Sequence, residues 1–179
     1  ESITAFVQME MLESGYASVG EFHYVHHQPD GTPYDNIAEL SNRVIAAADQ
    51  SGIGLTLLPV LYEQGGVDGR GLGAGQIRFG NTAERFAKMH DDAAKSLTSL
   101  PKDAMIGTAP HSLRAVTKHS LANALPTSGP IHMHLAEQNA EVDEIRNAYG
   151  ARPVEWALDN LAMDDRWCLI HATQMTPDE

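Results

Sequence analysis

The sequence has few of the features that mark membrane, nucleic-acid-binding or disulfide-rich proteins. It holds a single cysteine, Cys168, so no internal disulfide can form, which fits a reducing compartment. Lysine and arginine number 12 against 24 aspartates and glutamates, and this net charge of −12 argues against nucleic acid and anionic membrane as partners. The longest apolar run, residues 53–61, has the length of a strand and not the roughly 20 residues of a membrane helix. No signal peptide pattern is visible, and we expect a cytoplasmic protein.

The sequence does contain a regular alternation of strand-like and helix-like segments. With 179 residues, 42% of them hydrophobic, it is long enough for one domain with a real core. Strands are predicted at 17–22, 53–61, 103–109, 130–135 and 167–171, and helices at 3–13, 36–50, 82–100, 114–125, 139–149 and 153–160. Strict alternation of this kind predicts an α/β fold with a parallel sheet. It leaves open whether the sheet is doubly wound or closed into a barrel.

One long loop and both chain ends call for interpretation. Residues 62–80 contain seven glycines and follow neither a helical nor a strand period, so we expect a functional loop, with a lid as one possibility. The chain begins inside an apolar helical pattern without an initiator methionine. It ends at Thr176-Pro177, a pair that normally opens a helix. We therefore expect the chain to be a piece of a longer protein.

The most informative stretch is Pro130-Ile-His-Met-His-Leu-Ala-Glu137. Because side chains two residues apart in a strand point to the same face, His132 and His134 can look into one site, with Glu137 just past the strand end. Imidazole nitrogen is a common ligand of divalent metals, and a nearby carboxylate can move protons to and from a water bound there. The stretch suggests a hydrolytic metal site, although His132 by itself is better explained as a hydrogen-bonded core histidine.

Residues capable of chemistry follow each of the five predicted strands. In a parallel barrel the carboxyl ends of all strands open on one face, where active sites form, so packing alone is a poor explanation of this pattern. Other interpretations stay open: His26 and His27 as solvated loop residues, His90 and His119 as surface residues of helices, and Arg114 as a helix cap or the partner of an acid. The strand-end residues are His23, Tyr24, His26, His27, Tyr62, Glu63, His111, Arg114, His134, Glu137, His171, Thr173 and Gln174.

Four segments resemble a known family. They are GEFHYVHH from Gly20, APHSLRAV from Ala109, HMHLAEQ from His132 and LIHATQ from Leu169. The last two place His-x-His-x-x-Glu at one strand end and a single histidine at the next, and they resemble strands five and six of amidohydrolase-superfamily deaminases. The first two resemble, more narrowly, the formimidoylglutamate deiminase family within that superfamily. The similarity extends over nearly the whole chain.

This resemblance implies catalytic roles for three residues. His134 matches the strand-five zinc ligand of the family. Glu137 matches the glutamate that shuttles protons between the attacking water and the leaving nitrogen, and His171 matches the strand-six histidine that orients or polarises that water. The implied reaction is zinc-dependent hydrolytic deimination of N-formimino-L-glutamate to N-formyl-L-glutamate and ammonia, a step of histidine degradation, with iron as an alternative metal.

The resemblance also implies the fold, the substrate contacts and the partners. Tyr24, His111 and Arg114 match positions that hold the substrate, a small molecule with carboxylates. The fold would be a partial (β/α)8 TIM barrel of the metal-dependent hydrolase type, with about strands 2 to 6 present. Residues 1–179 would be a single catalytic barrel domain fragment. It would lack strands 1, 7 and 8, and with them the family's other zinc ligands, so the chain alone would be inactive. A homodimer is also expected.

Two other functions remain open at the level of sequence. The chain could belong to another amidohydrolase-superfamily deaminase that acts on a nucleobase-type ring. Such a ring would favour stacking side chains, yet only 6% of the residues are aromatic, and Arg114 has no evident use there. The chain could instead be a non-catalytic metal-binding or structural α/β domain.

Overall fold

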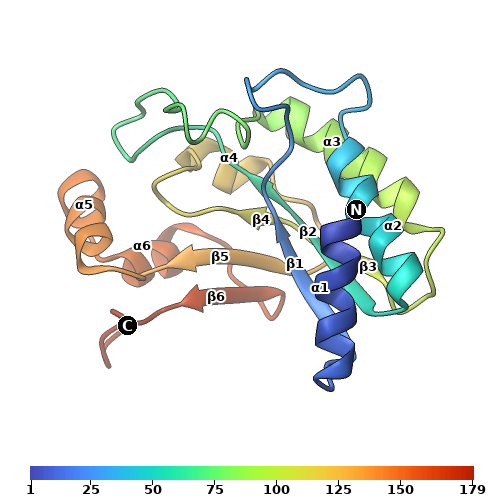
Figure 1. Ribbon diagram of the computed structural model, residues 1–179. Helices are drawn as coiled ribbons and strands as arrows, with labels where there is room; N and C mark the ends of the chain where they lie inside the picture. Colours follow the sequence, from blue (N-terminus) through green and yellow to red (C-terminus); the bar gives the residue numbers. More distant parts are fainter.

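The computed structural model describes residues 1–179, in which helices and parallel strands alternate along the chain (Figure 1). The strands are β1 (Ser18–His23), β2 (Gly54–Leu61), β3 (Met105–Ile106), β4 (Ala109–Pro110), β5 (Ile131–Leu135) and β6 (Trp167–His171). The helices are α1 (Ser2–Glu13), α2 (Glu39–Ser51), α3 (Ala83–Leu97), α4 (Lys118–Asn123), α5 (Asn139–Tyr149) and α6 (Pro153–Asn160). None of these helices is both long and apolar enough to cross a membrane.

The strands lie side by side in the order of the sequence. β2 pairs in parallel with β1 on one side and with β3 and β4 on the other, and β5 pairs in parallel with β6. A parallel bridge between Thr108 and Ile131 joins the two groups, and the N–H of His134 donates to the carbonyl oxygen of His111 (3.0 Å). A doubly wound sheet reverses its strand order at a switch point. The sequential order observed here is that of a barrel wall.

Local sequence explains why several elements begin and end where they do. The hydroxyl of Thr82 accepts a hydrogen bond from the N–H of Arg85 (3.3 Å) and caps α3, and Glu84 adds an acidic group to its first turn. α2 ends at Gly52, which adopts the left-handed conformation (φ +77°) that glycine tolerates best. Most of β2 is buried, which explains why its apolar run shows no alternation.

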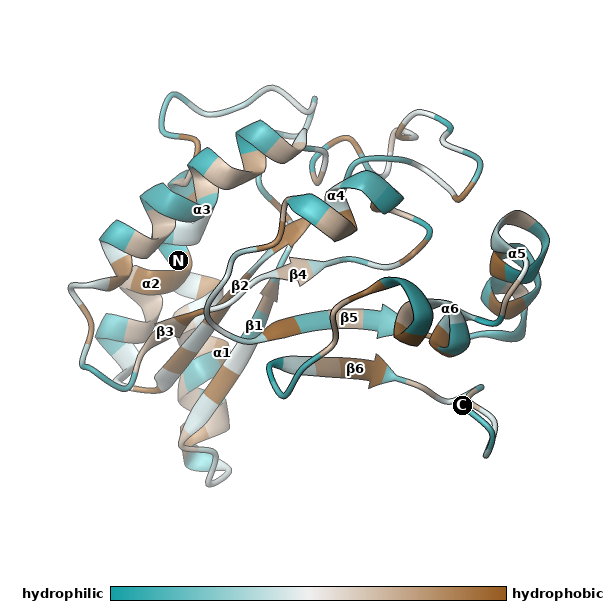
Figure 2. Cartoon of the chain, turned by 180° about the vertical axis from the view of Figure 1, so that it is seen from behind, coloured by the Kyte–Doolittle hydropathy of each residue, from teal (hydrophilic) through white to brown (hydrophobic).

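The sheet separates two apolar cores of unequal size. The larger contains 23 buried residues and lies between the strands and the helices, with Leu57, Phe86 and Met133 among its members. The smaller lies on the inner face of the strands and contains only Leu58, Val60, Tyr62, Ala109 and Ala115. In Figure 2 the strands carry much of the apolar colour, whereas the outer surface of α3 is polar. The inner face of the sheet is therefore only lightly filled.

Two predicted elements are shorter in the structure. The predicted strand 103–109 divides into β3 and β4, because Gly107 approaches the neighbouring strand so closely that a Cβ there would collide with the carbonyl oxygen of Pro130. The predicted helix 114–125 is reduced to α4. It starts after Thr117, whose hydroxyl accepts from the N–H of Ser120 (3.1 Å). The turns before Thr117 carry Arg114 toward the strand ends.

Candidate active site

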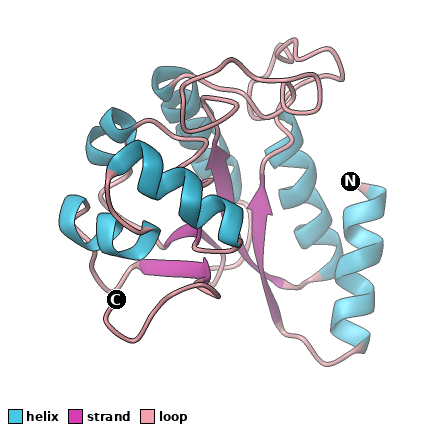
Figure 3. Cartoon of the chain, turned by 90° about the vertical axis from the view of Figure 1, so that its left-hand side faces the viewer, coloured by secondary structure: helices cyan, strands magenta, loops and turns pink.

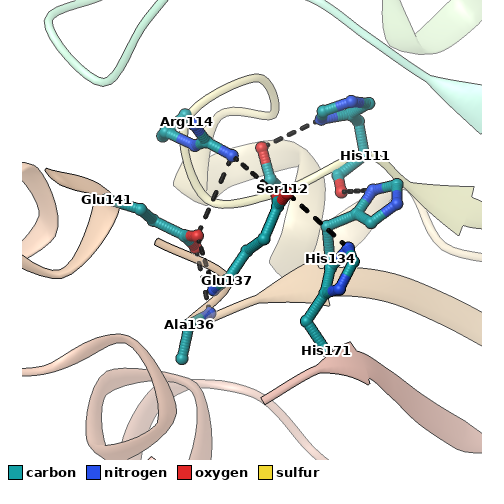
Figure 4. Close-up of polar contacts among 8 residues, drawn as sticks. All are labelled: His111, Ser112, Arg114, His134, Ala136, Glu137, Glu141 and His171. Carbon is teal, nitrogen blue, oxygen red and sulfur yellow. Dashed lines mark hydrogen bonds and ion pairs between the residues drawn. The ribbon is translucent and has the colours of Figure 1, made fainter. Parts of the chain in front are cut away.

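Three histidines, His111, His134 and His171, meet at the carboxyl ends of β4, β5 and β6 (Figure 4). The ring centroids of His111 and His134 are 5.1 Å apart, and those of His134 and His171 are 5.3 Å apart. We call these three residues the stacked histidine group. Glu137 and Arg114 lie beside it, so the structure brings five of the six predicted site residues together. Figure 3 shows loops gathering beyond the arrowheads of β1 and β2, at the same end of the strands.

His134 has one ring nitrogen engaged and the other free. Its Nδ1 donates to the carbonyl oxygen of His111 (3.2 Å), which sets the tautomer and leaves Nε2 without a hydrogen-bond partner. Burial lowers the pKa of His134 below its usual value, although the bond to His111 acts in the opposite direction. The ring is therefore neutral at pH 7. A neutral imidazole with a free nitrogen is the form that ligates a metal ion.

His171 reaches His134 through an uncommon backbone conformation. By strand register it lies beside Leu135, whose side chain belongs to the larger core, so regular alternation would direct it away from His134. The φ angles of His171 and Ala172 are +73° and +51°, values that few residues other than glycine adopt. The rings of His134 and His171 consequently stack with 22° between their planes. Strained backbone of this kind is typical of functional sites.

Arg114 lies among carboxylates but makes no hydrogen bond through its guanidinium group. Its Nη2 is 3.8 Å from Glu137 Oε2 and 3.8 Å from Glu141 Oε2, which is ion-pair distance and too long for a hydrogen bond. Its Nε is buried and has no partner. Glu137 Oε1 in turn lies 3.8 Å from His171 Nε2. The N–H donors of the two Nη atoms make no hydrogen bond within the chain and remain available to a ligand.

His111 is half-buried and electrically neutral. Its Nδ1 and the hydroxyl of Ser112 are 3.0 Å apart, and Nε2 makes no hydrogen bond. Burial lowers the pKa of His111 to about 3, and the neighbouring His134 and Arg114 act in the same direction. At neutral pH the ring can offer a hydrogen bond to a substrate but no charge.

Tyr24 lies apart from the other predicted site residues and is joined to them by aromatic rings. Phe22 contacts His134 (ring centroids 4.4 Å apart) and lies 6.2 Å from Tyr24. Tyr24 packs on Phe79 (4.7 Å), and Tyr62 packs on His111 (4.5 Å). We call Phe22, Tyr24, Tyr62 and Phe79 the aromatic wall. Sequence reasoning missed Phe22 and Phe79, although the position of Phe22 two residues before Tyr24, at the end of β1, was an available signal.

His132 shares the inner face of β5 with His134. It is half-buried and its ring makes no hydrogen bond, so its expected character as a hydrogen-bonded core histidine is wrong. Burial lowers the pKa of His132. The inner face is too lightly filled to enclose it, which explains why no partner reaches its ring.

The donor set for a metal ion is incomplete within residues 1–179. No group of three or more histidine, cysteine, aspartate or glutamate side chains is arranged to hold a metal ion. A catalytic zinc site needs three protein ligands and an open position. His134 has the features of a supported ligand, namely a free Nε2 and a backbone acceptor that fixes the ring. His26 and His27 also pair one ring nitrogen with a carbonyl oxygen, but their free Nδ1 atoms are buried. The residues therefore fit one part of a metal site.

A second cluster of histidines lies at the end of β1, and we call His23, His26 and His27 the buried histidine group. His26 and His27 are each 1% exposed, which rules out the interpretation of solvated loop residues that the sequence left open. His26 Nε2 donates to the carbonyl oxygen of Val60 (2.9 Å), and His27 Nε2 to that of Gly80 (2.8 Å). Burial lowers the pKa of His23 to about 4 and that of His26 to about 3.

The two helical histidines differ in their surroundings. His119 is exposed, as expected for a surface residue. His90 was also predicted to lie on the surface, and that prediction is wrong. It is half-buried, and its Nε2 lies 3.1 Å from the carbonyl oxygen of Gly107, at the break between β3 and β4.

Two glutamates have roles that differ from those read in the sequence. Glu63 was counted among the chemistry-capable strand-end residues, but its carboxylate accepts from the N–H of Thr117 (2.9 Å) and the hydroxyl of Ser120 (2.8 Å) at the start of α4. It also lines an open hollow of about 530 Å³ that none of the predicted site residues borders. Glu141, which sequence reasoning missed, lies buried against the site. Its position in the first turn of α5, four residues after Glu137, was a signal that could have found it.

Comparison with known proteins gives consistent results over the whole chain. The amidohydrolase family profile matches residues 2–179. The chain is 44% identical to formimidoylglutamate deiminase of Pseudomonas aeruginosa, over 100% of this chain and 40% of that protein. It is 25% identical to 5-methylthioadenosine/S-adenosylhomocysteine deaminase of Bacillus cereus, over 96% of this chain and 35% of that protein. The chain therefore spans about 40% or less of the length of these curated relatives.

Solved structures give the same result. The crystal structure of an amidohydrolase from Brucella melitensis superposes on this chain with a TM-score of 0.94 and 46% sequence identity. The match covers 98% of this chain and 40% of that one, and it implies a TIM-barrel-type fold. The sequential parallel strands, the site at their carboxyl ends and the match across residues 2–179 agree: the chain belongs to the amidohydrolase family.

Proposed function

We propose that this chain is part of a metal-dependent deiminase that hydrolyses N-formimino-L-glutamate to N-formyl-L-glutamate and ammonia, a step of histidine degradation. The observation that carries the proposal is the 44% identity to a formimidoylglutamate deiminase along the entire chain, joined to a site that offers a free imidazole, a carboxylate and an uncommitted guanidinium within one group. The reaction replaces the terminal imino nitrogen of the formimino group by the oxygen of water.

Arg114 binds a carboxylate of the substrate in this proposal. Its guanidinium makes no hydrogen bond within the chain, and its Nη atoms are not buried, so a planar carboxylate could take two parallel N–H donors from them. His111 and Tyr24 add neutral hydrogen-bond donors on the side of the aromatic wall. The overall charge of −12 does not attract an anionic substrate, so this local cation has to provide the recognition.

Glu137 moves the proton. Its two carboxylate oxygens lie between Arg114 and His171, so it can take a proton from the attacking water and deliver it to the departing nitrogen. His171 orients that water through its ring. His134 would hold the metal, zinc or iron, and a divalent metal there would supply a water of lowered pKa. General acid–base work of this kind contributes about 10²–10⁴-fold to the rate.

We further propose that residues 1–179 form one fragment of a single catalytic barrel domain, about strands 2 to 6 of a (β/α)8 barrel. β1 and β6 each pair with a neighbour on one edge only, which leaves both edges available to further strands. Strands 1, 7 and 8, with the remaining metal ligands, would lie outside the chain, which would be inactive alone. A homodimeric assembly and a cytoplasmic location stay predictions.

An ammonia-release assay tests the proposed function. Full-length protein loaded with zinc is incubated with N-formimino-L-glutamate, with guanine, cytosine and adenosine as controls. We expect ammonia release from N-formimino-L-glutamate alone. Absence of release from that substrate by folded, zinc-loaded protein would contradict the proposal.

A second candidate is deamination of a nucleobase-type ring. Two observations favour it: the aromatic wall beside His111 and His134, and 25% identity to a protein named 5-methylthioadenosine/S-adenosylhomocysteine deaminase. Aromatic side chains stack well on bases. Release of ammonia from 5-methylthioadenosine, and not from N-formimino-L-glutamate, would favour this candidate. Arg114 then has no carboxylate to bind, so its replacement would leave KM unchanged.

A further inference from the structure

Glu141 is a fully buried carboxylate that supports the site from behind (Figure 4). Its side chain is 0% exposed, although charged side chains are almost never fully buried without partners. Oε1 accepts from the N–H of Ala136 (3.1 Å), and Oε2 accepts from the N–H of Glu137 (2.9 Å). Both N–H groups belong to the turn that follows β5, in which Ala136 has a φ of +50°. The carboxylate thus holds an uncommon backbone conformation in place.

The same carboxylate also faces the guanidinium group of the site. Glu141 Oε2 is 3.8 Å from Arg114 Nη2, the same distance that separates this nitrogen from Glu137 Oε2. The cation is therefore attracted from two sides without losing a donor to a hydrogen bond. Because Glu141 is the fully buried member of the pair, its attraction is less screened by water than that of Glu137.

A capping role alone does not account for this arrangement. In a capping box the glutamate at the third helical position bonds to the N–H of the cap residue. Here the cap residue of α5 is Gln138. Glu141 accepts instead from the N–H groups of the two residues that precede this cap, Ala136 and Glu137. Its contacts are therefore with the peptide that carries Glu137 and with Arg114, both of which belong to the site.

We propose that Glu141 is a positioning residue that sets Glu137 and Arg114 relative to each other. The inference rests on the proposed function, in which Glu137 moves the proton and Arg114 binds the substrate carboxylate. Loss of the Glu141 charge removes one of the two attractions on Arg114 and frees the turn at Ala136. The first change weakens substrate binding, and the second lowers the rate of proton transfer, because a small misplacement of a reacting group costs much of the rate.

A double-mutant cycle in the full-length, zinc-loaded enzyme tests this role. Glu141→Gln keeps the shape of the side chain and removes its charge. We expect KM for N-formimino-L-glutamate to rise about tenfold and kcat to fall about tenfold, with unchanged zinc content. In an Arg114→Met background the KM effect of Glu141→Gln should shrink to less than twofold, because the residue acts through Arg114. The matched control is Glu144→Gln, an exposed acid of the same helix that should change neither constant.

Three results would overturn the inference: an unchanged KM in Glu141→Gln, a KM effect of equal size in both backgrounds, or the same effect in Glu144→Gln. If Glu141→Gln fails to fold, Glu141→Asp replaces it in the cycle. It keeps the charge but shortens the side chain, and it should raise KM in the wild-type background only.

Hydrogen exchange of the Ala136 and Glu137 amides separates this inference from the proposed function, because it needs no substrate. Both amides should exchange at least tenfold faster in Glu141→Gln while amides of the larger core keep their protection. Equal exchange in the two proteins would overturn the inference whatever the substrate is. Absence of ammonia release from wild type would contradict the proposed function alone.

Discussion

The two histidine groups occupy the same end of the sheet but differ in the surroundings of their free nitrogens. In the buried histidine group, His26 and His27 donate through Nε2 to carbonyl oxygens of neighbouring segments, and their Nδ1 atoms are buried without a partner. In the stacked histidine group, His134 donates through Nδ1 to a carbonyl oxygen, and its free Nε2 is not buried. Burial lowers the pKa of members of both groups, so neutrality does not distinguish them. An accessible free nitrogen beside a carboxylate and a cation is what distinguishes the stacked histidine group.

The alternation of β1 explains how neighbouring residues join different groups. Phe22 contacts His134 on the inner face, whereas the next residue, His23, lies beside His26 (ring centroids 5.1 Å apart). Successive side chains of a strand point to opposite faces, so one segment supplies both the wall of the site and the support behind it. Histidine content alone therefore overstates the size of an active site.

The largest expected effect comes from Glu137→Gln. This change removes the proton carrier and keeps its shape, so kcat for ammonia release should fall by about 10²–10⁴-fold while zinc content stays the same. Steady-state kinetics and metal analysis of the full-length enzyme measure both. Glu144→Gln on the exposed face of α5 is the control. Substantial activity in Glu137→Gln would show that this carboxylate does not move the proton. The carboxylate would then no longer distinguish the stacked histidine group from the buried histidine group.

A smaller effect should follow from Arg114→Met, which removes the cation and retains much of the apolar volume. Hydrogen bonds to charged groups contribute about 1.5–3 kcal/mol, so KM should rise by about one to two orders of magnitude, with a lesser change in kcat. Initial-rate kinetics over a range of N-formimino-L-glutamate concentrations give both constants. An unchanged KM would exclude Arg114 as the carboxylate ligand.

Substitution in the buried histidine group should lower the free energy of unfolding and leave kcat unchanged. His26→Phe removes the donor to the carbonyl oxygen of Val60 and leaves that buried acceptor unpaired, at a cost of about 1–3 kcal/mol in the free energy of unfolding. Denaturant unfolding measures the loss, and the folded variant should keep its kcat. His119→Gln, at an exposed position, is the control. A large loss of kcat with unchanged stability would show that His26 acts in catalysis, as the stacked histidine group is proposed to do.

The smallest effect is a pH dependence of stability. The pKa of His26 is about 3 in the folded protein, below its usual 6.5, so between these values the unfolded chain binds the proton and the folded protein does not. The stability from a neutral His26 is thus fully present above pH 6.5 and is lost as the pH falls toward 3, by on the order of 1 kcal/mol per pH unit. Unfolding experiments from pH 6.5 to 4.5 should give a shallower slope for His26→Phe. Equal slopes would contradict a buried, neutral His26.

Much of the fold was predictable because apolar periodicity reports burial directly. β2, β5, β6 and α5 lie within a residue or two of their predicted bounds, and the candidate site residues gather at the strand ends. The predictions for 103–109 and 114–125 were less accurate. The break at Gly107 depends on the close approach of Pro130, which is distant in sequence, whereas the cap at Thr117 is a local signal that the prediction of the second element did not use. Periodicity alone also left the barrel and the doubly wound sheet unresolved.

The site was predictable in its residue types and less so in its contacts. His134, Glu137 and His171 lie together as predicted, but alternation along β6 points His171 the other way, and only its left-handed backbone brings it to His134. Burial of His26 arises from tertiary packing, which no local pattern encodes. The hydrogen bonds of Glu141 are local, and its place in the first turn of α5 was a signal in the sequence. The assigned roles of these residues stay predictions until variants are measured.

Equilibrium zinc binding by two single variants of the full-length protein tests the division between the histidine groups most directly. His134→Asn removes the free imidazole, and His26→Asn removes a buried one at a matched change in size. Competition dialysis at pH 7.5 should give zinc affinity at least tenfold weaker than wild type for His134→Asn and within twofold of wild type for folded His26→Asn. Equal zinc affinity in the two variants would contradict the account.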